Sequence, residues 1–152
     1  MNAKGEGIHR RGTEFAELAR SEVTGSVLGA AFEVHTLLGP GLLESAYQHA
    51  LAHELLLRGV RFESQVMIPL RYKNATLEST LRIDLLVAGE VIVEIKSVAA
   101  LADIHQAQLL TYLRLTGLST GLLVNFNVVS LKQGIKRVIN TQRNSVNSVP
   151  LR

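Results

Sequence analysis

Apolar side chains recur at helical spacing through the first part of the chain. Between residues 13 and 38 they return every three or four positions, and Gly39-Pro40-Gly41 then ends the pattern. A second amphipathic segment covers residues 42–58 and is followed by Gly59, a residue typical of the position after a helix. The pattern predicts two helices, preceded by a flexible segment at residues 1–12.

The alternation then changes to a period of two residues, which is typical of strands. Three such segments, at residues 61–72, 76–87 and 91–97, are joined by short turns and predict an antiparallel meander. Pro69 lacks the N–H group that a central strand needs, so it places the first segment at a sheet edge or at a bulge.

The rest of the chain returns to mixed patterns. It predicts a helix over residues 103–116, a buried strand over 120–126, a basic helix over 130–141 and a flexible tail at 143–152. The order of elements is ααβββαβα. We therefore predict a single α/β domain over residues 13–142, with a central mixed sheet of about four strands flanked by helices.

Composition excludes several kinds of site. The 152 residues include no cysteine, so disulfides, thiolate zinc sites, iron–sulfur clusters and cysteine nucleophiles are excluded. No apolar run is long enough to span a membrane and the polar start has no leader-like apolar region, so we expect a cytoplasmic protein without membrane contact. The net charge of +3 permits an anionic partner, but ordinary surface lysines and arginines explain it equally well.

Two acidic residues stand inside predicted strands, where charged side chains are disfavoured. Asp84 lies in RIDLLV and Glu94 in VIVEIKS, and Lys96 shares the strand face of Glu94 because it is two residues further on. If residues 88–90 form a three-residue hairpin loop containing Gly89, Asp84 lies directly opposite Glu94. A two-residue loop would turn Asp84 to the other face, and we favour the longer loop.

Directly opposed carboxylates repel each other unless a cation lies between them. Magnesium prefers oxygen ligands, often one or two carboxylates together with water and phosphate oxygens. The pair Asp84 and Glu94 therefore indicates a metal site, with Lys96 placed to orient water or to stabilise charge on a phosphate. The alternative is a salt-bridged cluster of these three side chains on an exposed sheet face.

The residues from Asp84 to Lys96, DLLVAGEVIVEIK, resemble the D…ExK signature of the PD-(D/E)XK nuclease superfamily. Residues 41–47, GLLESAY, resemble the pattern that names the GxxExxY proteins within it, and the likeness extends from about Val23 to Asn140. The resemblance implies a restriction-endonuclease-like core. One departure is Arg82, which stands before the aspartate where a small or aromatic residue is usual.

The resemblance also implies roles for individual residues. Asp84 and Glu94 are expected to bind Mg²⁺ or Mn²⁺, and Glu44 joins them from a helix as a third metal ligand. The expected catalytic residues are the two carboxylates with Lys96 and Gln108. An acidic residue in the first turn of a helix is also favoured by the helix dipole, which is the alternative for Glu44.

Further residues are candidates for support or substrate binding. Gln108 and Tyr112 resemble a Q-x-x-x-Y element, and their spacing places both on one face of the helix at 103–116. Gln108 could instead be a buried amide bonded to the backbone. Lys132, Lys136 and Arg137 make the last predicted helix basic, which suits a phosphate-backbone contact or an ordinary solvated face.

The function predicted on these grounds is Mg²⁺-dependent hydrolysis of phosphodiester bonds in nucleic acid, with DNA expected rather than RNA. Two alternatives share the fold: a module that binds nucleic acid without cutting it, and a subunit that is active only with a partner. A homodimer is left open. The intact set of Asp84, Glu94 and Lys96 favours the nuclease.

Overall fold

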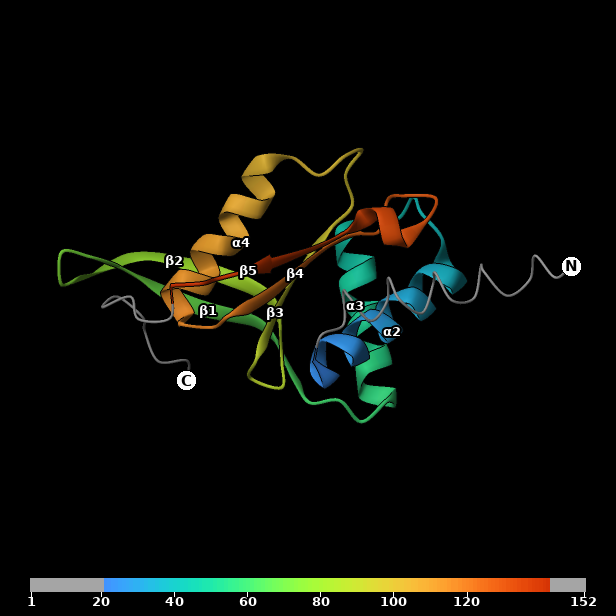
Figure 1. Cartoon of the computed structure of the whole chain (residues 1–152), viewed down its shortest axis with the longest axis horizontal. Helices are drawn as coiled ribbons and strands as arrows, with labels where there is room; N and C mark the ends of the chain where they lie inside the picture. The colour runs from blue at the N-terminus through green and yellow to red at the C-terminus, as the bar shows by residue number, and fades with distance from the viewer. Residues whose placement is uncertain (1–20, 143–152) are drawn as a thin grey trace, which may run out of the picture.

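The computed structural model describes residues 21–142 (Figure 1), so the predicted flexible segments at 1–12 and 143–152 lie outside the described residues. The same holds for the first part of the helix predicted over 13–38. The described helix begins at Glu22, because Ser21 has an extended backbone and its hydroxyl accepts a hydrogen bond from the Thr24 N–H (3.1 Å). A helix running unbroken through Ser21 was therefore a wrong prediction.

Helices and strands follow in an order that matches the prediction up to the last element. The first group is α2 (Glu22–Leu38), α3 (Glu44–Leu57), β1 (Phe62–Tyr72), β2 (Ala75–Val87) and β3 (Val91–Lys96). The second group is α4 (Asp103–Thr116), β4 (Thr120–Asn125), the 3₁₀ helix η1 (Leu131–Gly134) and β5 (Ile135–Ile139). No helix among residues 21–142 combines the length and the apolar character needed to cross a membrane.

The five strands form one mixed sheet in the order β1-β2-β3-β4-β5. β1, β2 and β3 are antiparallel neighbours, β4 joins β3 in parallel through the α4 crossover, and β5 pairs antiparallel with β4. β1 is an edge strand, and its register shifts between Pro69 and Arg71. Pro69 therefore lies both on an edge strand and beside a register shift, which confirms the two predicted locations. A proline has no N–H group to donate within a central ladder, so it is tolerated at such positions.

The helix predicted over residues 130–141 is wrong. A short 3₁₀ helix ends at Gly134, and Ile135–Ile139 add a fifth strand to the edge of β4. Gly134 lies so close to the Asn125 carbonyl that a side chain there would clash with it. The glycine breaks the helical pattern, and β-branched residues then satisfy the open edge of β4 with ladder hydrogen bonds.

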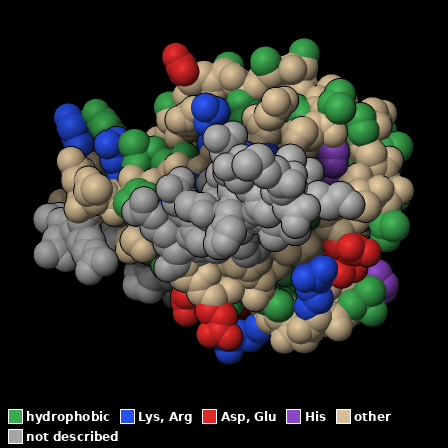
Figure 2. Space-filling view, turned by 45° about the vertical axis from the view of Figure 1, so that its right-hand side comes forward, with side chains coloured by type: hydrophobic (Ala, Val, Ile, Leu, Met, Phe, Trp, Pro, Cys, Tyr) green, Lys and Arg blue, Asp and Glu red, His purple; other side chains and the backbone are tan. Residues whose placement is uncertain are grey.

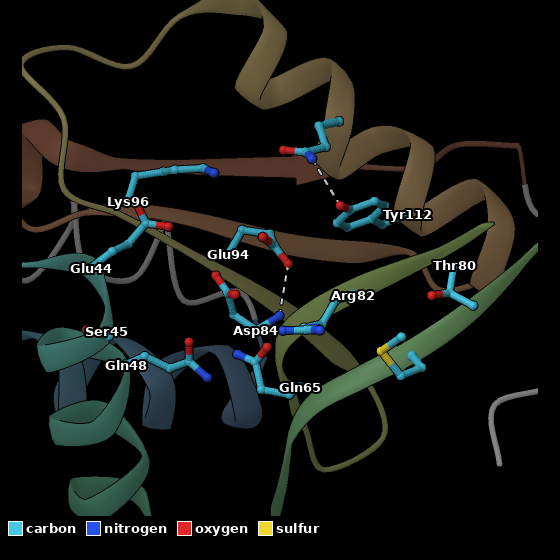
Figure 3. Close-up of a pocket in the computed structure, with 12 residues that line it drawn as sticks. Glu44, Ser45, Gln48, Gln65, Thr80, Arg82, Asp84, Glu94, Lys96 and Tyr112 are labelled. Atoms are coloured by element: carbon cyan, nitrogen blue, oxygen red, sulfur yellow. Dashed lines mark hydrogen bonds between the residues drawn. The ribbon is translucent and has the colours of Figure 1, made fainter.

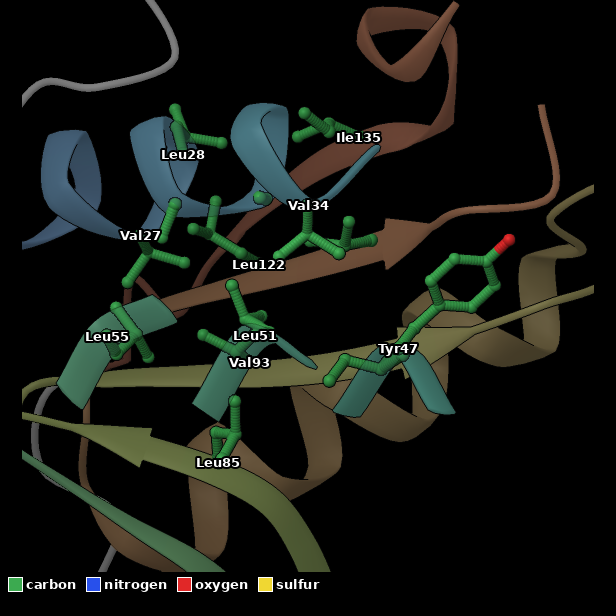
Figure 4. Packing of buried hydrophobic residues seen from close by; sticks show 14 of the residues in the cluster. Val27, Leu28, Val34, Tyr47, Leu51, Leu55, Leu85, Val93, Leu122 and Ile135 are labelled. Carbon is green, nitrogen blue, oxygen red and sulfur yellow. The ribbon is translucent and has the colours of Figure 1, made fainter. Parts of the chain in front are cut away.

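Helices cover both faces of the sheet (Figure 1). One hydrophobic cluster joins α2 and α3 to the sheet, and Figure 4 shows Val27 and Val34 of α2, Leu51 of α3, and Val93 and Leu122 of the strands meeting within it. A second cluster packs α4 against the opposite face. The site described below lies around Asp84 of β2 and Glu94 of β3, where residues of α3 and α4 line the same pocket.

The face alternation of β2 changes phase beside Asp84. Leu85 and Val87 belong to the cluster beneath α2 and α3, whereas Ile83 belongs to the cluster beneath α4. Gln65 of β1 stands opposite Asp84 and has a left-handed backbone (φ 53°), and this pair is missing from the ladder between Ser64↔Leu85 and Val66↔Ile83. The register of β1 and β2 is the same on both sides of this missing pair, so no extra residue is inserted, and the irregularity coincides with the change of face in β2 beside Asp84.

The loop before α3 is held by Tyr47. Its ring is buried and stacks on Phe126, with 4.6 Å between ring centroids. Its hydroxyl donates to the Gly39 carbonyl (2.5 Å) and accepts from the Leu42 N–H (3.1 Å). The tyrosine therefore packs in the core and uses its hydroxyl to fix the loop, which sets the position of the following helix start at Glu44.

Candidate active site

Two carboxylates replace the backbone pairing where β2 and β3 separate. The hairpin register pairs Val87 with Val91 around the three-residue loop 88–90, as predicted, and the backbone ladder ends at Leu85↔Val93. Beyond it, the Asp84 N–H donates to Glu94 Oε1 (3.1 Å), and the Ile95 N–H donates to Asp84 Oδ2 (2.9 Å). The two acidic side chains therefore lie on the same side of the sheet, locked to each other's strand (Figure 3).

Glu94 is poorly compensated in the absence of a cation. Glu94 is only 5% exposed to solvent. Burial raises the pKa of its carboxyl to about 8, and the negative charge of Asp84 is the second cause of the increase. The backbone hydrogen bond from Asp84 and the charge of Lys96 lower the pKa less than burial raises it. A divalent cation would relieve this, so the donor set fits a hard metal ion.

The metal-free protein is expected to lose stability as the pH rises. The pKa of the Glu94 carboxyl is about 8 in the folded protein and 4.5 in the reference state, so the folded protein holds this proton more tightly than the unfolded chain. The stability that protonation of Glu94 gives to the folded state is therefore complete below pH 4.5 and is lost as the pH rises to about 8. The slope is at most about 1.4 kcal/mol per pH unit. Urea unfolding in EDTA from pH 4.5 to 9 measures it. Glu94→Gln should flatten the profile and Glu90→Gln, in an exposed turn, should not; parallel profiles for Glu94→Gln and wild type would contradict the assignment.

Lys96 lies at the end of β3, in the same pocket as the two carboxylates (Figure 3). Its carbonyl accepts from the Phe126 N–H (3.0 Å), and the next residue, Ser97, donates its hydroxyl to the Leu42 carbonyl (2.6 Å). Within residues 21–142, Lys96 makes no ion pair with Asp84 or Glu94. The alternative of an exposed salt-bridged cluster does not describe this site. Glu94 is buried, and among the described residues Lys96 forms no salt bridge with either carboxylate.

Glu44 lines the same pocket from the first turn of α3 and is exposed to solvent. Over the described range 21–142, no three His, Cys, Asp or Glu side chains surround a common metal position. The structure thus brings Asp84 and Glu94 together and leaves Glu44 as a neighbouring oxygen donor on the α3 wall. Two carboxylates with open positions are sufficient for magnesium, which retains several waters in most sites.

The pocket has a volume of about 570 Å³, and its walls come from five elements, which are α3, β1, β2, β3 and α4. Gln108 and Tyr112 of α4 form one wall and are joined by a hydrogen bond from Gln108 Nε2 to the Tyr112 hydroxyl (3.0 Å). The prediction that they share a helix face is confirmed, and the alternative of a buried, backbone-bonded Gln108 is wrong. The lining residues are Glu44, Ser45, Gln48, Gln65, Met67, Thr80, Arg82, Asp84, Glu94, Lys96, Gln108 and Tyr112.

A family comparison identifies this arrangement. The model of the PD-(D/E)XK nuclease superfamily matches residues 21–138, which is most of the chain and includes all the lining residues. The chain belongs to the PD-(D/E)XK nuclease superfamily. No curated protein and no solved structure matches it. The α/β prediction with a restriction-endonuclease-like core is confirmed, with five strands in place of about four.

Several residues in the pocket of this PD-(D/E)XK domain were not predicted as site residues. Gln48 lies one turn after Glu44, and Thr80 and Arg82 precede Asp84 by even steps along β2, so periodicity could have found them. Gln65 could not have been found in this way. Its place depends on its left-handed backbone (φ 53°), which no local sequence pattern predicts.

The basic residues near the end of the PD-(D/E)XK domain lie elsewhere. Lys132 belongs to η1, and Lys136 and Arg137 belong to β5, the far edge strand of the sheet. None of them is among the residues that line the pocket. A contact from them to nucleic acid stays a prediction about the surface outside the pocket.

Proposed function

We propose that this protein is a metal-dependent nuclease that hydrolyses phosphodiester bonds in nucleic acid, with DNA as the expected substrate. The observation that carries the proposal is the pair of Asp84, which is half-buried, and Glu94, which is buried. Each is bonded to the other's strand in a pocket that also holds Lys96. We further assign the chain to the GxxExxY group, on Gly41, Glu44 and Tyr47.

The three residues of that motif have distinct physical roles in support of the proposal. Gly41 has a left-handed backbone (φ 101°), which glycine adopts without strain and which the turn before α3 requires. Tyr47 pins the loop through Gly39 and Leu42. Glu44 is thereby presented to the pocket at the start of the helix.

Asp84 and Glu94 would hold Mg²⁺ or Mn²⁺, and Glu44 offers a further oxygen ligand or a bond to metal-bound water. A bound ion of this kind supplies positive charge to a phosphoryl oxygen and lowers the pKa of a water molecule. Glu94 is buried beside Asp84, and the two carboxylates repel each other when both are charged. A bound divalent ion would offset this repulsion, which favours ion binding at this position.

Lys96 is assigned the orientation of the attacking water, or stabilisation of negative charge on the phosphate. A protonated lysine has three donors and no acceptor, so it suits either task and is not a metal ligand. Gln108 supports the same site, because its Nε2 is committed to the Tyr112 hydroxyl and its carbonyl oxygen stays available as an acceptor. Tyr112 and, outside the pocket, Lys132, Lys136 and Arg137 are assigned to substrate binding.

The test is incubation of the full chain with single- and double-stranded DNA and RNA, in Mg²⁺, Mn²⁺ or EDTA. We expect cleavage with a divalent ion and none in EDTA. Binding without cleavage of any substrate would favour the non-cutting module instead. Cleavage that appears only when a cell extract is added, and that Asp84→Asn abolishes, would favour the partner-dependent subunit.

A further inference from the structure

Three glutamine side chains from three separate elements converge on the pocket. Gln48 comes from α3, Gln65 from β1 and Gln108 from α4, and Figure 3 shows Gln48 and Gln65 beside Asp84. Gln108 is bonded to Tyr112, whereas the side-chain amides of Gln48 and Gln65 have no hydrogen-bond partner within residues 21–142. Each of these two amides is therefore available, with both a donor and an acceptor, to a molecule in the pocket.

The charge of the lining does not suit a phosphate backbone alone. Three acidic side chains and two basic ones, Arg82 and Lys96, line the pocket, so one divalent ion would leave it with a single net positive charge. Proteins that bind duplex DNA through its backbone neutralise many phosphates with lysine and arginine. On the part of the face in Figure 2 that shows described residues, Lys and Arg side chains stand in separate small groups.

Amides instead match the edges of nucleobases. Phosphate oxygens only accept hydrogen bonds, whereas base edges present donors and acceptors together, as a glutamine amide does. Met67 is half exposed and adds an apolar side chain to the same wall, which suits the face of a base. A volume of about 570 Å³ is in the range of small-ligand pockets.

The left-handed backbone of Gln65 indicates a functional role for this residue. A residue with a side chain is rarely found at φ 53°, and such strain gathers at functional sites. Gln65 is exposed, and among residues 21–142 its side chain has no hydrogen-bond partner that would require a glutamine there. Its conformation directs the side chain into the pocket beside the acidic pair.

We propose that the pocket takes an unpaired nucleotide next to the scissile phosphate and that Gln48 and Gln65 bind the edge of its base. The substrate is then single-stranded or locally opened nucleic acid, because in a duplex the pairing edges of the bases are occupied by the opposite strand. This inference rests on the proposed function and specifies its substrate class.

Binding is measured in Mg²⁺ with Lys96→Ala, which keeps the substrate intact. The ligands are a single strand of mixed sequence, the same strand with abasic sites, and a blunt duplex of equal length. We expect the intact strand to bind at least about tenfold more tightly than either of the others. Gln65→Gly and Gln48→Ala should reduce the affinity for the intact strand towards the abasic level and leave the abasic strand unchanged.

Two controls separate base recognition from folding. Glycine is at ease at φ 53°, so Gln65→Gly should melt no lower than its parent, and Gln133→Ala, at an exposed residue of η1 outside the pocket, should keep the full discrimination. Equal binding of the intact and abasic strands overturns the inference, and so does tighter binding of the duplex.

The wild-type cleavage rates distinguish the two levels of the proposal. Duplex cut as fast as single strand means that the nuclease function stands and the inference fails. Base-dependent binding with no cleavage of any strand means that the inference on the ligand stands and the nuclease function fails. If Lys96→Ala does not fold, initial cleavage rates of wild type and Gln65→Gly on the same three substrates give the same comparison.

Discussion

Replacing Lys96 by alanine is expected to reduce cleavage by about 10²–10⁴-fold while leaving metal binding intact. The lysine lies in the pocket with the two carboxylates but, within the described residues, pairs with neither, so its charge is available to the reacting groups. An interaction made chiefly in the transition state affects the rate far more than it affects substrate affinity. Cleavage rate, substrate affinity and the melting shift caused by Mg²⁺ are measured on one purified variant.

The controls for this variant distinguish three roles of the lysine. Lys73→Ala, at an exposed turn residue beside Tyr72, should cut at the wild-type rate. A Lys96→Ala protein that binds nucleic acid less tightly, beside a wild type that never cuts, would identify a simple phosphate contact. A variant with a much lower melting temperature in EDTA would show that Lys96 mainly compensates the charge of Asp84 and Glu94.

Asp84→Asn is expected to abolish the stabilisation that Mg²⁺ or Mn²⁺ gives to the wild type. An ion that binds only the folded state stabilises it by about 2.7 kcal/mol at a hundred times its Kd, and this shift should disappear together with cleavage. The variant should stay folded, since the asparagine carbonyl can still accept from the Ile95 N–H. Its melting temperature in EDTA should equal or exceed that of wild type, because the repulsion towards Glu94 is removed.

The matched control for the metal response is Glu78→Gln, an exposed acidic residue on the same strand and outside the pocket. It should keep the full shift, which differential scanning fluorimetry measures over a series of Mg²⁺ concentrations. An unchanged metal response in Asp84→Asn would mean that the ion binds elsewhere and would remove the basis of the proposed site.

Local patterns in the sequence were sufficient for most of the elements and for the central pair of acids. Glycines and prolines marked the ends of helices, and the three-residue loop at 88–90 set the register that puts Asp84 opposite Glu94. Turn length and side-chain alternation are local properties, so they can be derived without knowledge of the rest of the fold. The positions of Gln108 and Tyr112 on one helix face follow from the same kind of argument.

Tertiary contacts decided what local patterns could not. Residues 135–139 pair with the open edge of β4, and that partner outweighs the helical pattern because ladder hydrogen bonds satisfy both strands. Gln65 has a left-handed backbone where its pairing with Asp84 is missing from the ladder, and its amide lines the pocket beside that aspartate. This irregularity involves two paired strands, so a local sequence pattern does not predict it. The sequence indicates Glu94 as a candidate site residue, but it does not show that the pKa of its carboxyl is raised. That shift arises from burial of Glu94 in the folded protein and from the nearby charge of Asp84.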